Sequence, residues 1–571
     1  MPLSVRSLCH CGRAPRRSPY VHAISPEHQR IYLLTDDVSR PAVLSDRATD
    51  DANSAPPRAD AALLRRIWRL HFWIGLFCAP ALVVLACSGL IILYSQPLDS
   101  WLNRDLLVVT PGSQTVPLDD QIAAAQRRVG PDHDLDAVIP PAAADRATRV
   151  DFLPPGATGF PESENNLTQV FVDPYTGEVL GQRSELSGLV GWANQVHRLF
   201  GNDGPQLRLP SLGHLLDPDA YPEATIPVGI GNLWMELTAV WILVLLATGI
   251  YLWWPRAVEA AKPLLTVRWS RGGRVRWRDL HALVGVFIAV VVAGYVLSGL
   301  PWSRYWGENW RAFTTIVTPS AEVSTASIPE SIPESTPATM GDYDRLGRRV
   351  AWADVDDPVY ASQPTGLPRR LSFDDVDRVA KAERMLPGYA IIPPADDVED
   401  GRPVYGSYAV VNAWPQRLSE QRTLYVDQFS GRTVAEATAA QDGALARATS
   451  FGVDMHMGNQ FGWVTRLLAT LVCVGVLTSV VTAALMLVNR RRANGTALPR
   501  RTGADGRLGG RAAAVLIVPA VVLGVLFPVF GLSLLIVLAV EAGWSRRRRT
   551  GGTDTAPPTP SSVTVDSSIN P

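Results

Sequence analysis

The feature that most constrains this chain is an apolar stretch of 20 residues that occurs twice. The copies are His71–Leu90 and His281–Leu300, and both follow the pattern His-x3-Gly-x-Phe-x10-Ser-Gly-Leu without a gap. As an α-helix, each copy is about 30 Å long and nearly spans the hydrocarbon core of a bilayer. The repeat therefore predicts two equivalent membrane helices, each with a histidine at one end.

The composition agrees with a membrane protein. Hydrophobic residues make up 47% of the 571 residues and charged residues 19%, and the apolar residues are concentrated in long runs rather than spread along the chain. A net charge of −1 argues against a nucleic-acid partner. Three of the five cysteines, Cys78, Cys87 and Cys473, lie inside apolar runs, where we interpret them as small buried hydrophobic residues.

We expect four core membrane helices, at residues 63–95, 232–256, 281–302 and 463–490. Basic residues precede the first apolar run, which begins at His71, and fill the loop 257–280 between the second helix and the third. They also follow the fourth apolar run, at Arg490, Arg491 and Arg492. Because basic residues stay on the cytoplasmic side, this pattern places the N-terminus in the cytoplasm. The segments 96–231 and 303–462 are then external.

The ends of the chain differ from this core. Residues 1–60 and 550–571 are rich in polar residues and proline, and we expect both to be disordered tails. Residues 512–542 are apolar, with Pro528 near the middle and arginines on both sides. This pattern favours a hydrophobic hairpin that turns at Pro528, and one long tilted span is the alternative.

The two external segments also resemble each other. In each, an Asp pair suits the start of a short helix, at 118–123 in the first segment and at 373–378 in the second. A strand, a turn with glycine and a returning strand follow at 169–180 and at 423–434. We expect a small external α+β domain in each segment, at about 115–187 and 370–440. The fold class is therefore an α-helical integral membrane protein built by tandem duplication.

Four histidines lie at the membrane boundaries of the two repeats. His71 and His281 begin the first helix of each repeat, on the predicted cytoplasmic side. His197 and His456 precede the second helix of each repeat, on the predicted external side. A boundary histidine can simply face the lipid headgroups, but ionisable residues at this depth are costly and indicate function. Because the four histidines occupy equivalent positions in two repeats, we interpret them as ligands of a metal.

Haem iron is the metal that this pattern fits best. Two opposed imidazoles close the coordination of a haem iron and leave a centre suited to electron transfer rather than to oxygen binding. We predict two haems b, one held by His71 and His281 and the other by His197 and His456. Zinc is the competing metal, but it usually takes four ligands, and no Cys or carboxylate cluster accompanies either pair. His214 is an alternative ligand for the external site.

Two glycines belong to the same predicted site. Gly75 and Gly285 each fall four residues after a histidine, on the same helical face. Since glycine has no side chain, both positions leave room for a flat macrocycle, and we count them as cofactor-binding residues. The alternative is that they allow close packing between helices.

These motifs resemble the family of PepSY-associated transmembrane-helix proteins over about residues 63–492. The resemblance rests on the repeated His-x3-Gly-x-Phe helix, on Phe171–Leu180, on the exit of the second helix at 247–256 and on Met-His-Met-Gly-Asn at 455–459. It implies that the external domains are PepSY-like and that the protein lies in a bacterial plasma membrane. It also implies an iron-regulated reductase that carries haem b and acts on ferric siderophores.

The histidine pattern and the family resemblance lead to the same hypothesis for the function. We predict transmembrane electron transfer through haem, from an unidentified cytoplasmic donor or membrane quinol to an external ferric siderophore or other ferric chelate. No Gly-x-Gly-x2-Gly nucleotide motif follows a predicted strand, so a nicotinamide cofactor would act on a separate protein. One alternative is a membrane-anchored PepSY module that binds or regulates a partner without redox activity. Another is a permease for the iron complex. We assign no catalytic residue.

Overall fold

A computed structural model describes most of the chain between residues 58 and 550. The described residues are 58–155, 167–199, 205–259, 266–270, 272–321, 352–354, 360–362, 369–399, 402–412, 415, 417–494 and 510–550. The predicted tails lie outside the described residues, except for 58–60 and Thr550, and so does part of the basic loop 257–280.

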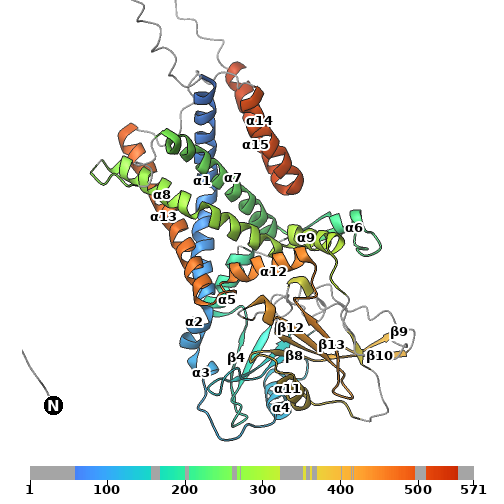
Figure 1. The fold of residues 1–571 in the computed structure, drawn as a ribbon. Coiled ribbons are helices and arrows are strands. Elements are labelled where there is room, and N and C mark those ends of the chain that lie inside the picture. The colour runs from blue at the N-terminus through green and yellow to red at the C-terminus, as the bar shows by residue number, and fades with distance from the viewer. Residues whose placement is uncertain are drawn as a thin grey trace, which may run out of the picture. The chain divides into compact units, whose positions relative to one another are not determined.

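Four long apolar helices form the membrane part of the described chain. They are α1 (Arg58–Leu93), α7 (Ile230–Glu259), α8 (Gly273–Gly299) and α13 (Trp463–Asn494). Each contains a stretch long and apolar enough to cross a membrane, which confirms the four predicted spans. Helix α1 contacts α7 and α13, and α8 contacts the same two helices, so the four helices pack as one bundle (Figure 1).

The helices begin earlier than the sequence pattern predicted. Helix α1 begins at Arg58 and α8 at Gly273, so His71 and His281 lie several turns inside their helices rather than at the first residue. The added turns are rich in arginine, whose long side chains reach polar surroundings while their backbone stays helical. Both histidines therefore have helical backbone on either side, which holds them more firmly than a helix end would.

The bundle is filled by apolar side chains from all four helices. Ile74 and Cys78 of α1 pack with Val240 of α7, Val292 of α8 and Val472 of α13 in one buried cluster. The Cys78 side chain is fully buried, as expected for a small hydrophobic residue, whereas Cys87 is exposed and Cys473 is half-buried. The cluster fixes the relative depth of the helices that carry the candidate ligands.

Short helices connect the bundle to the rest of the chain. They are α2 (Ser95–Leu102), α3 (Arg104–Leu107), α5 (Gly188–Leu199), α6 (Leu212–Leu216), α9 (Arg304–Val317), α12 (Ala444–Met457) and the 3-10 turn Leu300–Trp302. Strands β5 (Gln206–Pro210) and β6 (Thr225–Gly229) flank α6 as a hairpin. Helix α5 contacts α1, and α12 contacts α8.

Glu236 is a buried carboxylate in the apolar span of α7, and it holds the N-terminus of α9. Its Oε1 accepts hydrogen bonds from the backbone N–H groups of Tyr305 (3.0 Å) and Trp306 (2.9 Å). Asn232, one turn earlier, accepts the N–H of Arg304 at 3.0 Å. Helix N-termini leave such N–H groups without partners and favour negative charge. Glu236 therefore has a structural role at the start of α9.

The last apolar region forms two helices, α14 (Gly510–Leu526) and α15 (Pro528–Thr550). The two helices contact each other, and a Cβ atom on Gly531 would lie 2.7 Å from the carbonyl oxygen of Gly524. Phe527 and Phe530 at the turn enter the buried cluster of the bundle. The apolar stretches of both helices are shorter than the four spans.

The two segments that are predicted to be external form one large antiparallel sheet rather than two separate ones. Its strand order is β13-β12-β11-β8-β1-β2-β3-β4. Strands β1 to β4 come from the first segment, and β8 and β11 to β13 from the second. The bounds are Asp134–Ile139, Thr148–Leu153, Thr168–Val172 and Val179–Ser184, then Ala390–Ile392, Tyr408–Asn412, Arg422–Val426 and Thr433–Thr438. Strands β7 (Ala361–Ser362), β9 (Asp397–Glu399) and β10 (Arg402–Gly406) form a smaller sheet.

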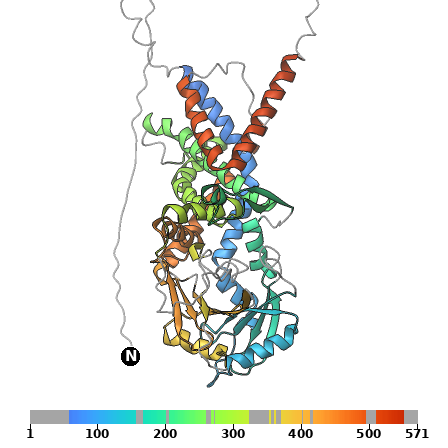
Figure 2. The same cartoon turned by 90° about the vertical axis from the view of Figure 1, so that its right-hand side faces the viewer.

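The two halves of the large sheet meet at one pair of strands. Val138 of β1 pairs with Ile391 of β8, and both side chains are fully buried. Each of these strands would otherwise be an edge with unpaired backbone groups, which promotes pairing with another strand. Helices α4 (Leu118–Val129) and α11 (Phe373–Ala382) lie side by side against this sheet (Figures 1 and 2).

The helices α4 and α11 cap each other. The Asp374 carboxylate accepts the backbone N–H groups of Leu118 (2.7 Å) and Asp119 (3.1 Å) at the start of α4. The Asp119 carboxylate accepts those of Phe373 (3.1 Å) and Asp374 (3.2 Å) at the start of α11. Burial and the adjacent Asp374 carboxyl raise the pKa of Asp119. The Asp pairs predicted as helix starts thus also join the two external segments.

Substituting Asp374→Ala should destabilise this joint by about 1 kcal/mol, the typical cost of losing a helix cap. The loss leaves two backbone N–H groups of α4 without their acceptor. Thermal unfolding of the detergent-solubilised protein, followed by circular dichroism, measures the effect as a lower midpoint. The matched control is Asp120→Ala, at the exposed position next to Asp119. An equal decrease of the unfolding midpoint in both variants would contradict the capping role.

Candidate functional site

The four candidate histidines form two facing pairs. The ring centroids of His71 on α1 and His281 on α8 are 6.4 Å apart, with the ring planes at 76°. The centroids of His197 on α5 and His456 on α12 are 6.2 Å apart, with the planes at 67°. The structure therefore brings together the same two pairs that the sequence repeat suggested. We call them the inner pair and the outer pair.

In the inner pair, hydrogen bonds define which nitrogen carries the proton. His71 Nδ1 lies 3.2 Å from the carbonyl oxygen of Leu245, and His281 Nδ1 lies 3.0 Å from that of Ser479. A carbonyl oxygen can only accept, so both Nδ1 atoms must be N–H donors. Each neutral ring then keeps its free lone pair on Nε2. Metal-binding histidines characteristically donate their other nitrogen to a carbonyl or carboxylate in this way.

The outer pair has the same tautomer for the same reason. His456 Nδ1 donates to the carbonyl oxygen of Tyr295 at 2.8 Å. His197 Nδ1 lies 3.0 Å from Ser88 Oγ, and that hydroxyl already donates its own hydrogen to the Val84 carbonyl at 2.7 Å. Ser88 is therefore the acceptor, and His197 is the donor.

Burial keeps the outer imidazoles uncharged. Burial, followed by the neighbouring His456, lowers the pKa of His197 to about 4, and burial also lowers the pKa of His456. Both rings are then neutral at pH 7, and a neutral imidazole is the form that binds metals.

The spacing within each pair fits two imidazoles on opposite sides of one metal ion. An imidazole nitrogen binds a first-row metal at about 2.0 Å and the ring centroid lies about 1 Å behind it, so opposed rings have centroids about 6 Å apart. The observed separations are 6.4 and 6.2 Å. Among the described residues, no group of three or more His, Cys, Asp or Glu side chains could hold a metal ion. Two imidazoles alone suit haem, whose macrocycle supplies the other ligands, better than zinc.

Glycines from neighbouring helices contact three of the four rings. A Cβ atom would lie 3.1 Å from His71 Cε1 at Gly249, 3.2 Å from His197 Cε1 at Gly89, and 2.9 Å from His456 Cε1 at Gly299. The Ser-Gly step that ends each copy of the sequence motif therefore contacts a ligand of the outer pair. Sequence reasoning missed this role, and the recurrence of Ser-Gly in both copies was the signal that could have revealed it.

The glycines predicted to make room for a macrocycle contact no ring. A Cβ atom at Gly285 would meet nothing within 4 Å, and one at Gly75 would lie 3.6 Å from Leu245 Cδ1, an ordinary contact. The cofactor-binding role of both glycines stays a prediction.

The predicted alternative ligand, His214, lies elsewhere. It is on α6, between β5 and β6, and its Nδ1 donates to the carbonyl oxygen of Tyr221 at 2.9 Å. His214 thus holds its own loop together, and His456 is the residue that faces His197.

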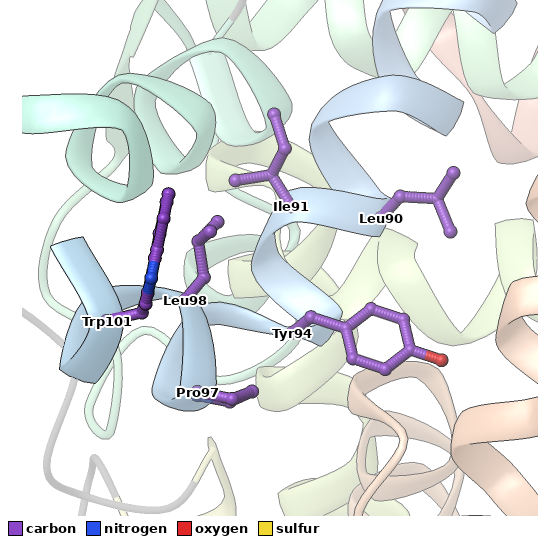
Figure 3. Close-up of a pocket in the computed structure, with 6 residues that line it drawn as sticks. All are labelled: Leu90, Ile91, Tyr94, Pro97, Leu98 and Trp101. Atoms are coloured by element: carbon purple, nitrogen blue, oxygen red, sulfur yellow. The ribbon is translucent and has the colours of Figure 1, made fainter.

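An apolar pocket of about 450 Å³ lies at the end of α1 (Figure 3). It is lined by Leu90, Ile91, Tyr94, Pro97, Leu98 and Trp101, from the end of α1 and from α2. Leu90 directly follows Gly89, which contacts His197. The Tyr94 hydroxyl is hydrogen-bonded to Thr470 Oγ1 at 2.9 Å. The lining suits an apolar molecule such as a lipid chain and adds no ligand to the outer pair.

Substituting Gly299→Ala should disturb the outer pair only. The new methyl group would lie 2.9 Å from His456 Cε1 and 3.4 Å from its Nδ1, so the His456 ring must move. Gly294→Ala on the same helix, where nothing lies within 4 Å, is the matched control. Absorbance spectra of the purified variants should show loss of one haem for Gly299→Ala and none for Gly294→Ala. Equal haem content in the two variants would contradict this contact.

The comparisons with known proteins identify the family of the chain. None of the curated proteins matches the chain. The family described as the PepSY-associated TM region matches residues 68–490, a range that includes both histidine pairs and most of each of the four spans. The protein is therefore a membrane protein, and its chain belongs to the family of PepSY-associated TM regions.

Proposed function

We propose that this protein transfers electrons across the membrane through two haems b, to an external acceptor that is a ferric siderophore or another ferric chelate. The observation that carries the proposal is that the histidines face each other in an inner pair and an outer pair. In every ring, Nδ1 is hydrogen-bonded within the protein and Nε2 keeps its lone pair. His71 and His281 would hold one haem, and His197 and His456 the other. A bound haem supplies an iron that gains and loses one electron.

The protein residues favour electron transfer over binding of oxygen. The two histidines of each pair would together complete the coordination of a haem iron and leave no position for oxygen. The backbone acceptors of the inner pair come from helices of the bundle, namely Leu245 on α7 and Ser479 on α13. Ligands held in this way do not need to move when the charge at the site changes, and this rigidity favours rapid transfer of single electrons.

The distribution of arginine supports the proposed direction of electron transfer, from the cytoplasmic side to the external side. Arg65, Arg66 and Arg69 precede His71 on α1, and Arg274, Arg276 and Arg278 precede His281 on α8. Because basic residues mark the cytoplasmic side, the inner pair lies toward the cytoplasm, and the outer pair lies toward the external sheet. With this orientation, one candidate site would lie near each face of the membrane.

A vesicle assay tests the proposal. Purified protein is reconstituted into lipid vesicles that contain dithionite, ferric citrate is added outside, and external ferrous iron is detected with ferrozine. The expected result is ferrous iron formed at a rate proportional to the amount of protein. A rate equal to that of protein-free vesicles, with haem present in the protein, would overturn the proposed function. The matched control is the double variant His71→Ala/His456→Ala, which lacks one ligand at each site.

A further inference from the structure

Each of the four candidate ligands contacts a hydroxyl group from another helix. The Nδ1 atoms of the inner pair lie 3.0 Å from Thr248 Oγ1 and 3.2 Å from Thr482 Oγ1. Those of the outer pair lie 3.0 Å from Ser88 Oγ and 3.3 Å from Ser298 Oγ. Both serines stand 17 residues after the inner-pair histidine of the same helix. Helices α1 and α8 therefore each carry one inner ligand and the hydroxyl that contacts one outer ligand.

These hydroxyls are acceptors toward the histidines because their hydrogens are already used. Thr248 donates to the carbonyl oxygen of Val244 (2.8 Å), and Thr482 to that of Thr478 (2.8 Å). Ser88 donates to Val84 (2.7 Å), and Ser298 to Tyr295 (3.2 Å). Each oxygen thus directs a lone pair at an imidazole N–H. At His71, His281 and His456 this N–H is shared between the hydroxyl and the backbone carbonyl oxygen described above. The backbone fixes the direction of that lone pair, and with it the rotation of the ring.

Hydrogen bonds from Ser and Thr to their own helix backbone are common in apolar helices and carry no function by themselves. Thr478 on α13 is such a case, since its hydroxyl donates to the Val474 carbonyl at 2.8 Å. What sets the other four apart is a second hydrogen bond, across to a histidine of a different helix. This second bond recurs at all four histidines.

We propose that Thr248, Thr482, Ser88 and Ser298 are positioning residues that fix the orientation and basicity of the four haem ligands. The inference rests on the proposed function. An acceptor on the outer nitrogen of a metal-bound imidazole fixes the ring and raises the basicity of the ligand. Greater basicity favours the more positive, ferric form of the iron. Removing the hydroxyl should therefore raise the midpoint potential of the haem on that pair.

The test uses one variant for each site in the full-length protein. Thr482→Val removes the hydroxyl next to His281 and keeps the side-chain shape, and Ser298→Ala does so next to His456. We expect each variant to shift the midpoint potential of one haem upward and to leave the other unchanged. Transfer of the affected haem to apomyoglobin should become about 10-fold faster, because loss of such supporting contacts weakens metal sites by about that factor. Thr482→Ser keeps a hydroxyl, so its midpoint potential and its rate of haem transfer should equal those of the natural protein.

Thr478→Val on the same helix is the matched control and should titrate and release haem like the natural protein. If the natural protein holds two haems and Thr482→Val and Ser298→Ala behave like Thr478→Val, the positioning role is wrong, while the proposed function stands. If the natural protein holds no haem, both proposals fail. If Thr482→Val does not fold, Thr482→Ala and Thr482→Ser supply the comparison between a side chain without and with the hydroxyl.

Discussion

Replacing His71 by alanine is expected to remove one of two haems and to leave the other in place. The two pairs share no histidine, and each ring has its acceptors on its own neighbouring helix. The loss of one axial imidazole opens the inner site without changing a contact of the outer pair. The measurement is the reduced-minus-oxidised absorbance of the purified variant, normalised to protein, with His281→Ala expected to give the same spectrum.

A suitable control for this experiment is His214→Ala. That ring is hydrogen-bonded to Tyr221 within its own loop, so its removal should leave both haems bound. Two retained haems in His71→Ala would show that this residue is not a ligand. Loss of both haems in a variant that remains folded would contradict two independent sites.

The second large effect is expected at the outer pair. In His456→Ala, the inner pair stays intact, so one haem should remain and its spectrum should still change on addition of dithionite. Reduction of external ferric citrate by dithionite-loaded vesicles should fall to the level of protein-free vesicles, because the site near the external face is lost. His197→Ala should behave in the same way, since both rings belong to one pair. External reduction at the natural rate in either variant would contradict the need for the outer site.

The membrane part of the fold was predictable because its signals are local. Four apolar runs identify the four spans, and the repeated motif identifies His71 and His281 as equivalent. The facing pairs follow from placing equivalent histidines at the same depth. The exact helix ends did not follow, because the arginine-rich turns before His71 and His281 lack the apolar pattern that marks a span.

The single external sheet was not predictable from the same signals. Strand patterns were visible around Val172 and Val426, but the joint lies between β1 and β8, whose paired residues Val138 and Ile391 are far apart in the chain. Register between distant strands depends on backbone pairing and on the shared core, and neither leaves a local trace in the sequence. The mutual capping by Asp119 and Asp374 likewise needs the two helix starts to be adjacent.

The same limit explains what was missed at the site. The sequence showed that Ser88 and Gly89 recur as Ser298 and Gly299, but it did not show which residue they contact. Their partner, His197 or His456, comes from the other end of an external segment. Spacing within one helix instead favours Gly75 and Gly285 as cofactor-binding residues, because each lies one helical turn from a histidine. Contacts between helices, rather than spacing within one helix, hold the rings in place.

The central claim is that both histidine pairs hold haem, and the haem content of the natural protein tests it most directly. Protein purified from haem-replete cells should contain two haems b per chain, and its reduced-minus-oxidised spectrum should be that of low-spin iron with two imidazole ligands. Protein that is folded and contains no haem would contradict the account.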